Sequence, residues 1–148
     1  MKNICLALLL ILSATALQGA TLEIKFIYRR AIQYLKDNDF EAAKKELLKI
    51  VKTNPNIPEV HNNLGYIFER QLDWDSAEIA YKKALALKSD YAACQNNLAN
   101  IYLKSGKNIG KAHDMLKVLA EKYKDNSDIL DSYGWSAFLL NSVDSLVV

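Results

Sequence analysis

The stretch Asn62-Asn63-Leu64-Gly65-Tyr66-Ile67-Phe68 returns 34 positions later as Asn96-Asn97-Leu98-Ala99-Asn100-Ile101-Tyr102. Each copy places one small residue, Gly65 or Ala99, among larger apolar ones, which lets two helices approach closely. An ordinary helical bundle has no reason to repeat such a pattern at a fixed spacing, whereas stacked helical repeats do. We therefore predict an all-α repeat protein.

The alternation of small and large residues continues outward from these stretches at the same offset. After Gly65 it goes on through Ala77, Tyr81 and Ala84, and the third copy matches if one residue is inserted between Lys104 and Gly110. An insertion in a turn costs little. We place complete units at 24–57, 58–91 and 92–126, and an incomplete fourth unit, one helix and a tail, at 127–148.

These offsets resemble the tetratricopeptide repeat family, whose pattern is W-x2-L-G-x2-Y in a first helix and A-x3-F in a second. The resemblance covers about residues 24 to 140. It implies a right-handed α-solenoid of about three and a half helix-turn-helix repeats. In the first unit Arg30 stands where the family has Leu, as expected for a first repeat whose outer face meets water.

Polar segments mark the turns inside the units. Asp37-Asn38-Asp39 precedes a second helix, and Asp39 is well placed to cap that helix by accepting from its first free amides. The same segment lacks the Gly and the Glu of a calcium loop. Gly106 to Ala112 is a poor phosphate-binding loop, because its glycines are too close and Ala112 replaces the required Ser or Thr.

The first residues are typical of a targeting segment. A positively charged start at Lys2 precedes the apolar run Ile4 to Leu12 and the small residues Ala14-Thr15-Ala16. We predict a signal peptide at 1–16, with cleavage as late as Ala20, and therefore an exported protein, periplasmic or secreted. An uncleaved anchor is the alternative, but the run is shorter than the roughly 20 residues that a spanning helix needs.

Composition argues against several classes of function. The 19 basic and 17 acidic residues are interspersed, so no basic stripe predicts nucleic-acid binding. Cys94, His61 and His113 have neither metal-ligand spacing nor a nucleophile partner, and we expect them to pack in the helices. An intermolecular disulfide through Cys94 is the alternative. We predict no enzyme activity, no cofactor and no metal.

In the resembled family the first helices line a concave surface that faces a bound peptide or helix. Transferred by repeat position, the resemblance implies the groove residues Tyr28, Ile32, Glu59, Asn62, Tyr66, Arg70, Asn96, Asn100, Trp135 and Phe138. Glu69 and Lys104 occupy neighbouring positions of the same surface. For the amides of Asn62, Asn63, Asn96 and Asn97, the alternative is that they bridge adjacent helices. Tyr66 and Trp135 are the strongest candidates.

The expected function is that of a scaffold or assembly factor in the cell envelope, with a protein or peptide as partner and the membrane reached only through envelope proteins. Two alternatives remain open: an adaptor for a partner enzyme, or the N-terminal fragment of a longer repeat protein. The fourth unit ends before its second helix, which leaves Phe138-Leu139-Leu140 without the usual cover. A second copy of the chain, packed on this helix, is one expected occupant.

Overall fold

The computed structural model describes residues 21–144, and every regular element in this range is a helix. The expected signal peptide lies outside the described residues. By its internal contacts the chain divides after Pro55 into two compact units, and each is described by itself.

The first unit is a helical hairpin. It consists of a helix over residues 21–36 and of α2, Phe40–Thr53. Asn38, with φ 58, reverses the chain, and the carboxylate of Asp39 accepts from the amide of Ala42 at 3.0 Å. The predicted N-cap is thus confirmed, and it supplies an acceptor to one of the four amides that a helix start leaves without a partner.

Arg30 does not simply face water, as its position in the first unit suggested. Its guanidinium donates to the carboxylate of Glu46, which also accepts from the Nζ of Lys49 at 2.8 Å. Burial alone would raise the pKa of Glu46, but the hydrogen bonds from Lys49 and Arg30 outweigh burial and lower it. The departure from the family pattern at Arg30 therefore holds a buried carboxylate.

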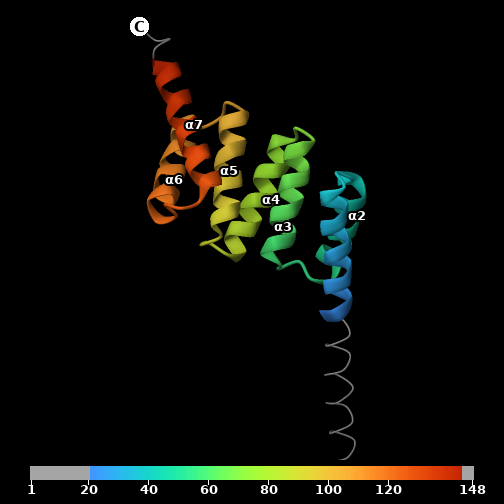
Figure 1. Ribbon diagram of the computed structural model, residues 1–148. Helices are drawn as coiled ribbons and strands as arrows, with labels where there is room; N and C mark the ends of the chain where they lie inside the picture. The colour runs from blue at the N-terminus through green and yellow to red at the C-terminus, as the bar shows by residue number, and fades with distance from the viewer. Residues whose placement is uncertain (1–20, 145–148) are drawn as a thin grey trace, which may run out of the picture. The chain divides into compact units, whose positions relative to one another are not determined.

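The second unit stacks two hairpins and a final helix. Helices α3, Pro58–Arg70, and α4, Trp74–Leu87, form the first hairpin; α5, Ala92–Lys104, and α6, Ile109–Lys122, form the second; α7, Ser127–Asp144, follows. Figure 1 shows the hairpins in succession along the unit. Helix α5 contacts both α3 and α7, so these three form one layer, which we call the first-helix layer.

The turns of the two hairpins differ by one residue. Residues 71–73 link α3 to α4, whereas 105–108 link α5 to α6, which confirms the predicted insertion. Leu72, Gly106 and Asn108 have φ values of 59, 69 and 57, in the left-handed region that Gly and Asn adopt most readily. Leu72 is the unexpected member of this group, and its side chain is 69% exposed.

The core of the second unit follows the alternation of small and large residues. The ring of Tyr81 lies on Gly65, and a methyl group there would be 2.6 Å from its Cδ1 and Cε1 atoms. Ala77, Ala84 and Ala99 are fully buried, as predicted. Small residues at these positions let the helices of a hairpin and of its neighbour approach to packing distance.

Helix α7 packs on the second hairpin through one face. Ile129, Ser132 and Ser136 are buried, and the Oγ of Ser136 lies 3.0 Å from the Nδ1 of His113 on α6. The rings of His113 and Tyr133 are 5.2 Å apart. The prediction of a packed imidazole at His113 is thus confirmed. Helix α7 has 18 residues, against 13 in α3 and in α5, so it runs beyond a first helix of the usual length.

Candidate protein-binding surface

The predicted groove residues fall in both units. Tyr28 and Ile32 belong to the helix over 21–36 in the first unit, where both are half-buried. The others lie on the first-helix layer of the second unit: Glu59, Asn62, Tyr66 and Arg70 on α3, Asn96 and Asn100 on α5, and Trp135 and Phe138 on α7.

Aromatic side chains reach the surface of this layer. Tyr66 is 37% exposed, Trp135 is 39% exposed and Phe138 is 66% exposed. Arg70 is also exposed, whereas Glu59 is half-buried. Exposed aromatic and Arg side chains are the residue types that most often anchor protein partners. The layer therefore has anchoring groups at both of its ends, on α3 and on α7.

Two side-chain hydrogen bonds that involve Asn62, Asn97 and Asn100 join the helices of the layer. The Nδ2 of Asn97 donates to the Oδ1 of Asn62 at 3.2 Å and joins α5 to α3. The Nδ2 of Asn100 donates to the Oγ of Ser132 at 3.0 Å and joins α5 to α7. The bridging alternative thus describes Asn62 and Asn97, and Asn100 has the same role toward the last helix.

Asn96 differs from these bridging amides. It is 8% exposed, and its Oδ1 is buried without a hydrogen-bond partner among the described residues. A buried acceptor that lacks a donor is costly, by about 1 to 3 kcal/mol. The side chain borders a hollow of about 130 Å³ between α5 and the start of α7, which is lined by Ala92, Ala93, Asn96, Asn97, Asn126, Asp128 and Ile129. A donor that entered this hollow could satisfy the oxygen.

Glu69 and Lys104 are committed to each other. The Nζ of Lys104 donates to the Oε1 of Glu69 at 2.6 Å, and the hydroxyl of Tyr81 donates to the Oε2 at 2.9 Å. Burial and the charge of Glu69 raise the pKa of Tyr81 well above its usual value. Although their repeat positions assign Glu69 and Lys104 to the groove surface, the two pair with each other and, together with Tyr81, connect α3, α4 and α5.

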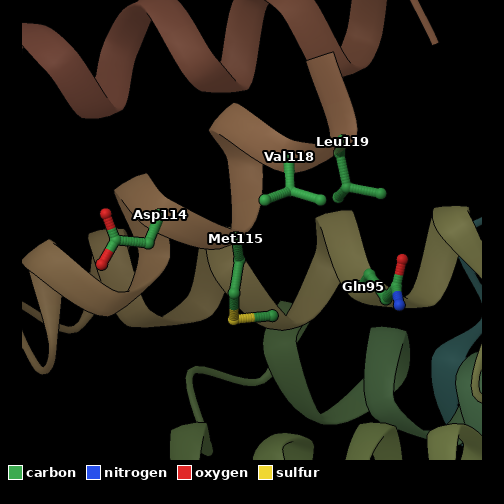
Figure 2. Close-up of a pocket in the computed structure, with 5 residues that line it drawn as sticks. All are labelled: Gln95, Asp114, Met115, Val118 and Leu119. Atoms are coloured by element: carbon green, nitrogen blue, oxygen red, sulfur yellow. The ribbon is translucent and has the colours of Figure 1, made fainter. Parts of the chain in front are cut away.

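An apolar hollow of the second unit lies apart from the predicted groove residues. Its volume is about 360 Å³, and its lining is Gln95, Asp114, Met115, Val118 and Leu119. Figure 2 shows the last four side chains on α6, with Gln95 across from them on α5. The sequence gives only a weak signal for this hollow. Met115 and Val118 are three residues apart, and apolar residues at that spacing occur in any amphipathic helix.

Cys94 is a core residue. It is fully buried and its thiol donates to the carbonyl of Tyr81, with a distance of 3.4 Å between Sγ and O. Burial raises the pKa of Cys94 to about 12, so the reactive thiolate is scarce at neutral pH. The packing prediction is confirmed. Among residues 21–144, no three His, Cys, Asp or Glu side chains gather as a metal site, and no helix is long and apolar enough to span a membrane.

Residues 28–92, from the first hairpin to the start of α5, match the tetratricopeptide repeat family. This part of the chain belongs to the tetratricopeptide repeat family. A curated relative, the uncharacterized protein ycf37 of Cyanophora paradoxa, is 36% identical over 74 residues, which are 47% of this chain and 42% of the relative. The match thus spans less than half of the relative's length.

Solved tetratricopeptide repeat structures share the fold at low identity. PilF of Pseudomonas aeruginosa superposes with a TM-score of 0.74 at 22% identity, over 83% of this chain and 56% of that one. The first tetratricopeptide repeat domain of Spaghetti (RPAP3), solved with the HSP90 peptide SRMEEVD, gives 0.72 at 15% identity, over 80% of this chain and 93% of that one. The predicted all-α helical repeat fold is confirmed.

Proposed function

We propose that this tetratricopeptide repeat protein is a non-enzymatic interaction scaffold that binds a peptide or helix on its first-helix layer. The observation that carries the proposal is Asn96, whose buried Oδ1 has no donor within residues 21–144 and borders a hollow between α5 and α7. The N–H of an extended peptide would supply that donor. The Spaghetti domain, of the same fold, was solved with a bound peptide.

The exposed aromatic residues would provide most of the binding energy. Trp135 and Phe138 on α7 can bury apolar side chains of the partner, and Tyr66 on α3 can do so at the other end of the layer. Burying an aromatic anchor in an interface typically contributes more than 1 kcal/mol. The proposed partner is therefore a segment with apolar side chains and at least one backbone amide free to donate to Asn96.

Capture of a partner from an extract tests this proposal, with crosslinking in the native compartment and mass spectrometry to identify the partner. Replacing Tyr66 and Trp135 by Ala should abolish capture without unfolding the protein. The matched control is Ile79→Ala with Val118→Ala, which removes exposed apolar side chains from α4 and α6, outside the first-helix layer. If both double variants capture the partner as well as the parent does, the layer is not the binding surface.

The same proposal places the protein outside the cytoplasm, in the cell envelope, where it would support an assembly process. Its basis is the sequence of residues 1–16, with the charged start, apolar run and small residues of a signal peptide. N-terminal sequencing of the mature protein tests it. A start at Leu17 or Thr21 supports export, whereas an intact N-terminus on a protein that fractionates with the cytoplasm contradicts it.

A further inference from the structure

Two glycines at the same repeat position have different surroundings. Gly65 on α3 is covered by the ring of Tyr81 from α4, and a methyl group there would be 2.6 Å from that ring. Gly134 on α7 stands one repeat beyond Ala99 in the same register, but a methyl group on it would meet no atom within 4 Å among the described residues. Within residues 21–144, no second helix covers Gly134.

The surface around Gly134 is apolar and open. Leu130, Gly134 and Phe138 follow one another at intervals of four, so they form a stripe along one side of α7. Leu130 is 40% exposed and Phe138 is 66% exposed, although the opposite side of the helix, at Ser132 and Ser136, is buried. We call the exposed stripe, with Asp131 beside it, the Gly134 face.

The charge of α7 indicates what would complement this face. Asp128 and Asp131 are exposed, and residues 127–144 contain no Lys or Arg. A second copy of α7 would bring further carboxylates toward these, and like charges in contact disfavour association. A basic segment would instead be attracted, and opposite charges at the rim of an interface raise both its specificity and its association rate.

We propose that the Gly134 face binds an amphipathic helix of a partner protein, with an aromatic ring on Gly134 and a Lys or Arg side chain opposite Asp131. The partner helix lies beside α7 as α4 lies beside α3. Tyr81 on Gly65 shows within this chain that an aromatic ring fits a glycine in this register. The Gly134 face shares Phe138 with the first-helix layer but does not include the Asn96 hollow, which lies at the start of α7.

A synthetic peptide with the sequence of residues 73–88 is the probe, because it contains the helix that already places Tyr81 on a glycine, together with Lys82, Lys83 and Lys88. Its binding to the full chain is measured by fluorescence anisotropy. Replacing Tyr81 by Ala in the peptide should weaken binding by at least about tenfold. Replacing the three lysines by Glu should also weaken binding, and the loss of affinity should be larger at low salt than at high salt.

In the protein, Gly134→Leu fills the space that the aromatic ring would occupy and should weaken peptide binding by at least about tenfold. The control is Gly110→Leu on α6, which also adds a side chain where no atom lies within 4 Å. Circular dichroism verifies that both variants keep the helical content of the parent. Asn96→Ala should leave binding of this peptide unchanged, so that failure of the proposed peptide site and failure of the Gly134 face can be told apart.

Three results would overturn the proposal. The first is no binding of the peptide at all, and the second is binding that Gly134→Leu does not weaken, since the peptide would then have exchanged with α4 at Gly65. The third is a parent protein that sediments as a dimer and that Gly134→Leu converts to a monomer, because a second copy of the chain would then be the occupant.

Discussion

The ring of Tyr81 lies so close to Gly65 that a methyl group on this glycine would be 2.6 Å from two of its carbons. Tyr81 is fully buried, and its hydroxyl is fixed by Glu69 at 2.9 Å, so the ring cannot move away without losing that hydrogen bond. The contact joins the two helices of the hairpin that carries the repeat pattern. Two opposing effects decide what a substitution at Gly65 does.

Gly65→Ala should destabilise the protein, although Ala is the better helix former by about 1 kcal/mol. The clash with a fully buried ring costs about 1 to 3 kcal/mol and outweighs the gain in helix propensity. The measurement is urea unfolding followed by circular dichroism. Gly110→Ala is the control, because it adds the same methyl group to α6 in open space. A Gly65→Ala variant as stable as this control would contradict the tight packing.

Tyr81→Phe tests the polar half of the same contact. It removes the donor to a buried carboxylate, and a hydrogen bond to a charged group contributes about 1.5 to 3 kcal/mol. Tyr102→Phe is the comparison, since Tyr102 donates at 2.8 Å to Glu78, whose side chain is more exposed and also pairs with Lys82. We expect the larger loss of unfolding free energy for Tyr81→Phe; equal losses would mean that burial of Glu69 has no effect.

Leu72→Asn should stabilise the protein. Leu72 has a φ of 59, and the left-handed region costs an ordinary residue roughly 1 to 2 kcal/mol, which Asn reduces. Asn38 and Asn108 adopt the same φ in the other two turns. The leucine side chain is largely exposed, so little packing is lost. We expect a gain of about 0.5 to 1 kcal/mol in thermal or urea unfolding; a loss would show that Leu72 has a contact partner in solution.

Residues whose roles depend on size could be predicted from the sequence. Ala77, Tyr81 and Ala84 recur at the spacing of two crossing helices, and Asp39 precedes its helix directly, so short-range patterns were sufficient. Roles that depend on side-chain direction across repeats could not. Asn96 and Asn97 are neighbours in the sequence, yet the Oδ1 of Asn96 is buried without a partner among the described residues, whereas the side chain of Asn97 bridges two helices.

The contact between Lys104 and Glu69 shows the same limit. These residues are 35 positions apart, and the repeat positions alone assign both to the exposed groove. Only the packing of α5 on α3 brings the ammonium group to 2.6 Å from the carboxylate, while Tyr81 approaches from a third helix. A pattern along one helix contains no information on which polar groups of neighbouring helices will satisfy one another.

Cys94 should react slowly with a thiol reagent in the folded protein. Its side chain is fully buried and burial raises its pKa to about 12, so both access and thiolate are limiting at neutral pH. In a variant without residues 1–16, which removes Cys5 and leaves Cys94 as the one cysteine, we expect a disulfide reagent to release its chromophore only at the rate of unfolding. Rapid labelling in native buffer, or a dimer on a non-reducing gel, would contradict the buried environment.

Acidification should weaken the first unit through Glu46. Lys49 and Arg30 hold the pKa of this carboxyl below its usual value despite burial. A lowered folded-state pKa gives stability that is complete above the unfolded pKa, about 4.3 for Glu, and that is lost as the pH falls through the folded-state value. The Glu46→Gln variant lacks this charge, so its thermal midpoint should lie below that of the parent at pH 7 and approach it at pH 3.

Glu41→Gln, at an exposed pair with Lys44, is the control and should leave the pH profile unchanged. Because both tryptophans, Trp74 and Trp135, lie in the second unit, hydrogen exchange of the α2 amides is the measurement that isolates the effect.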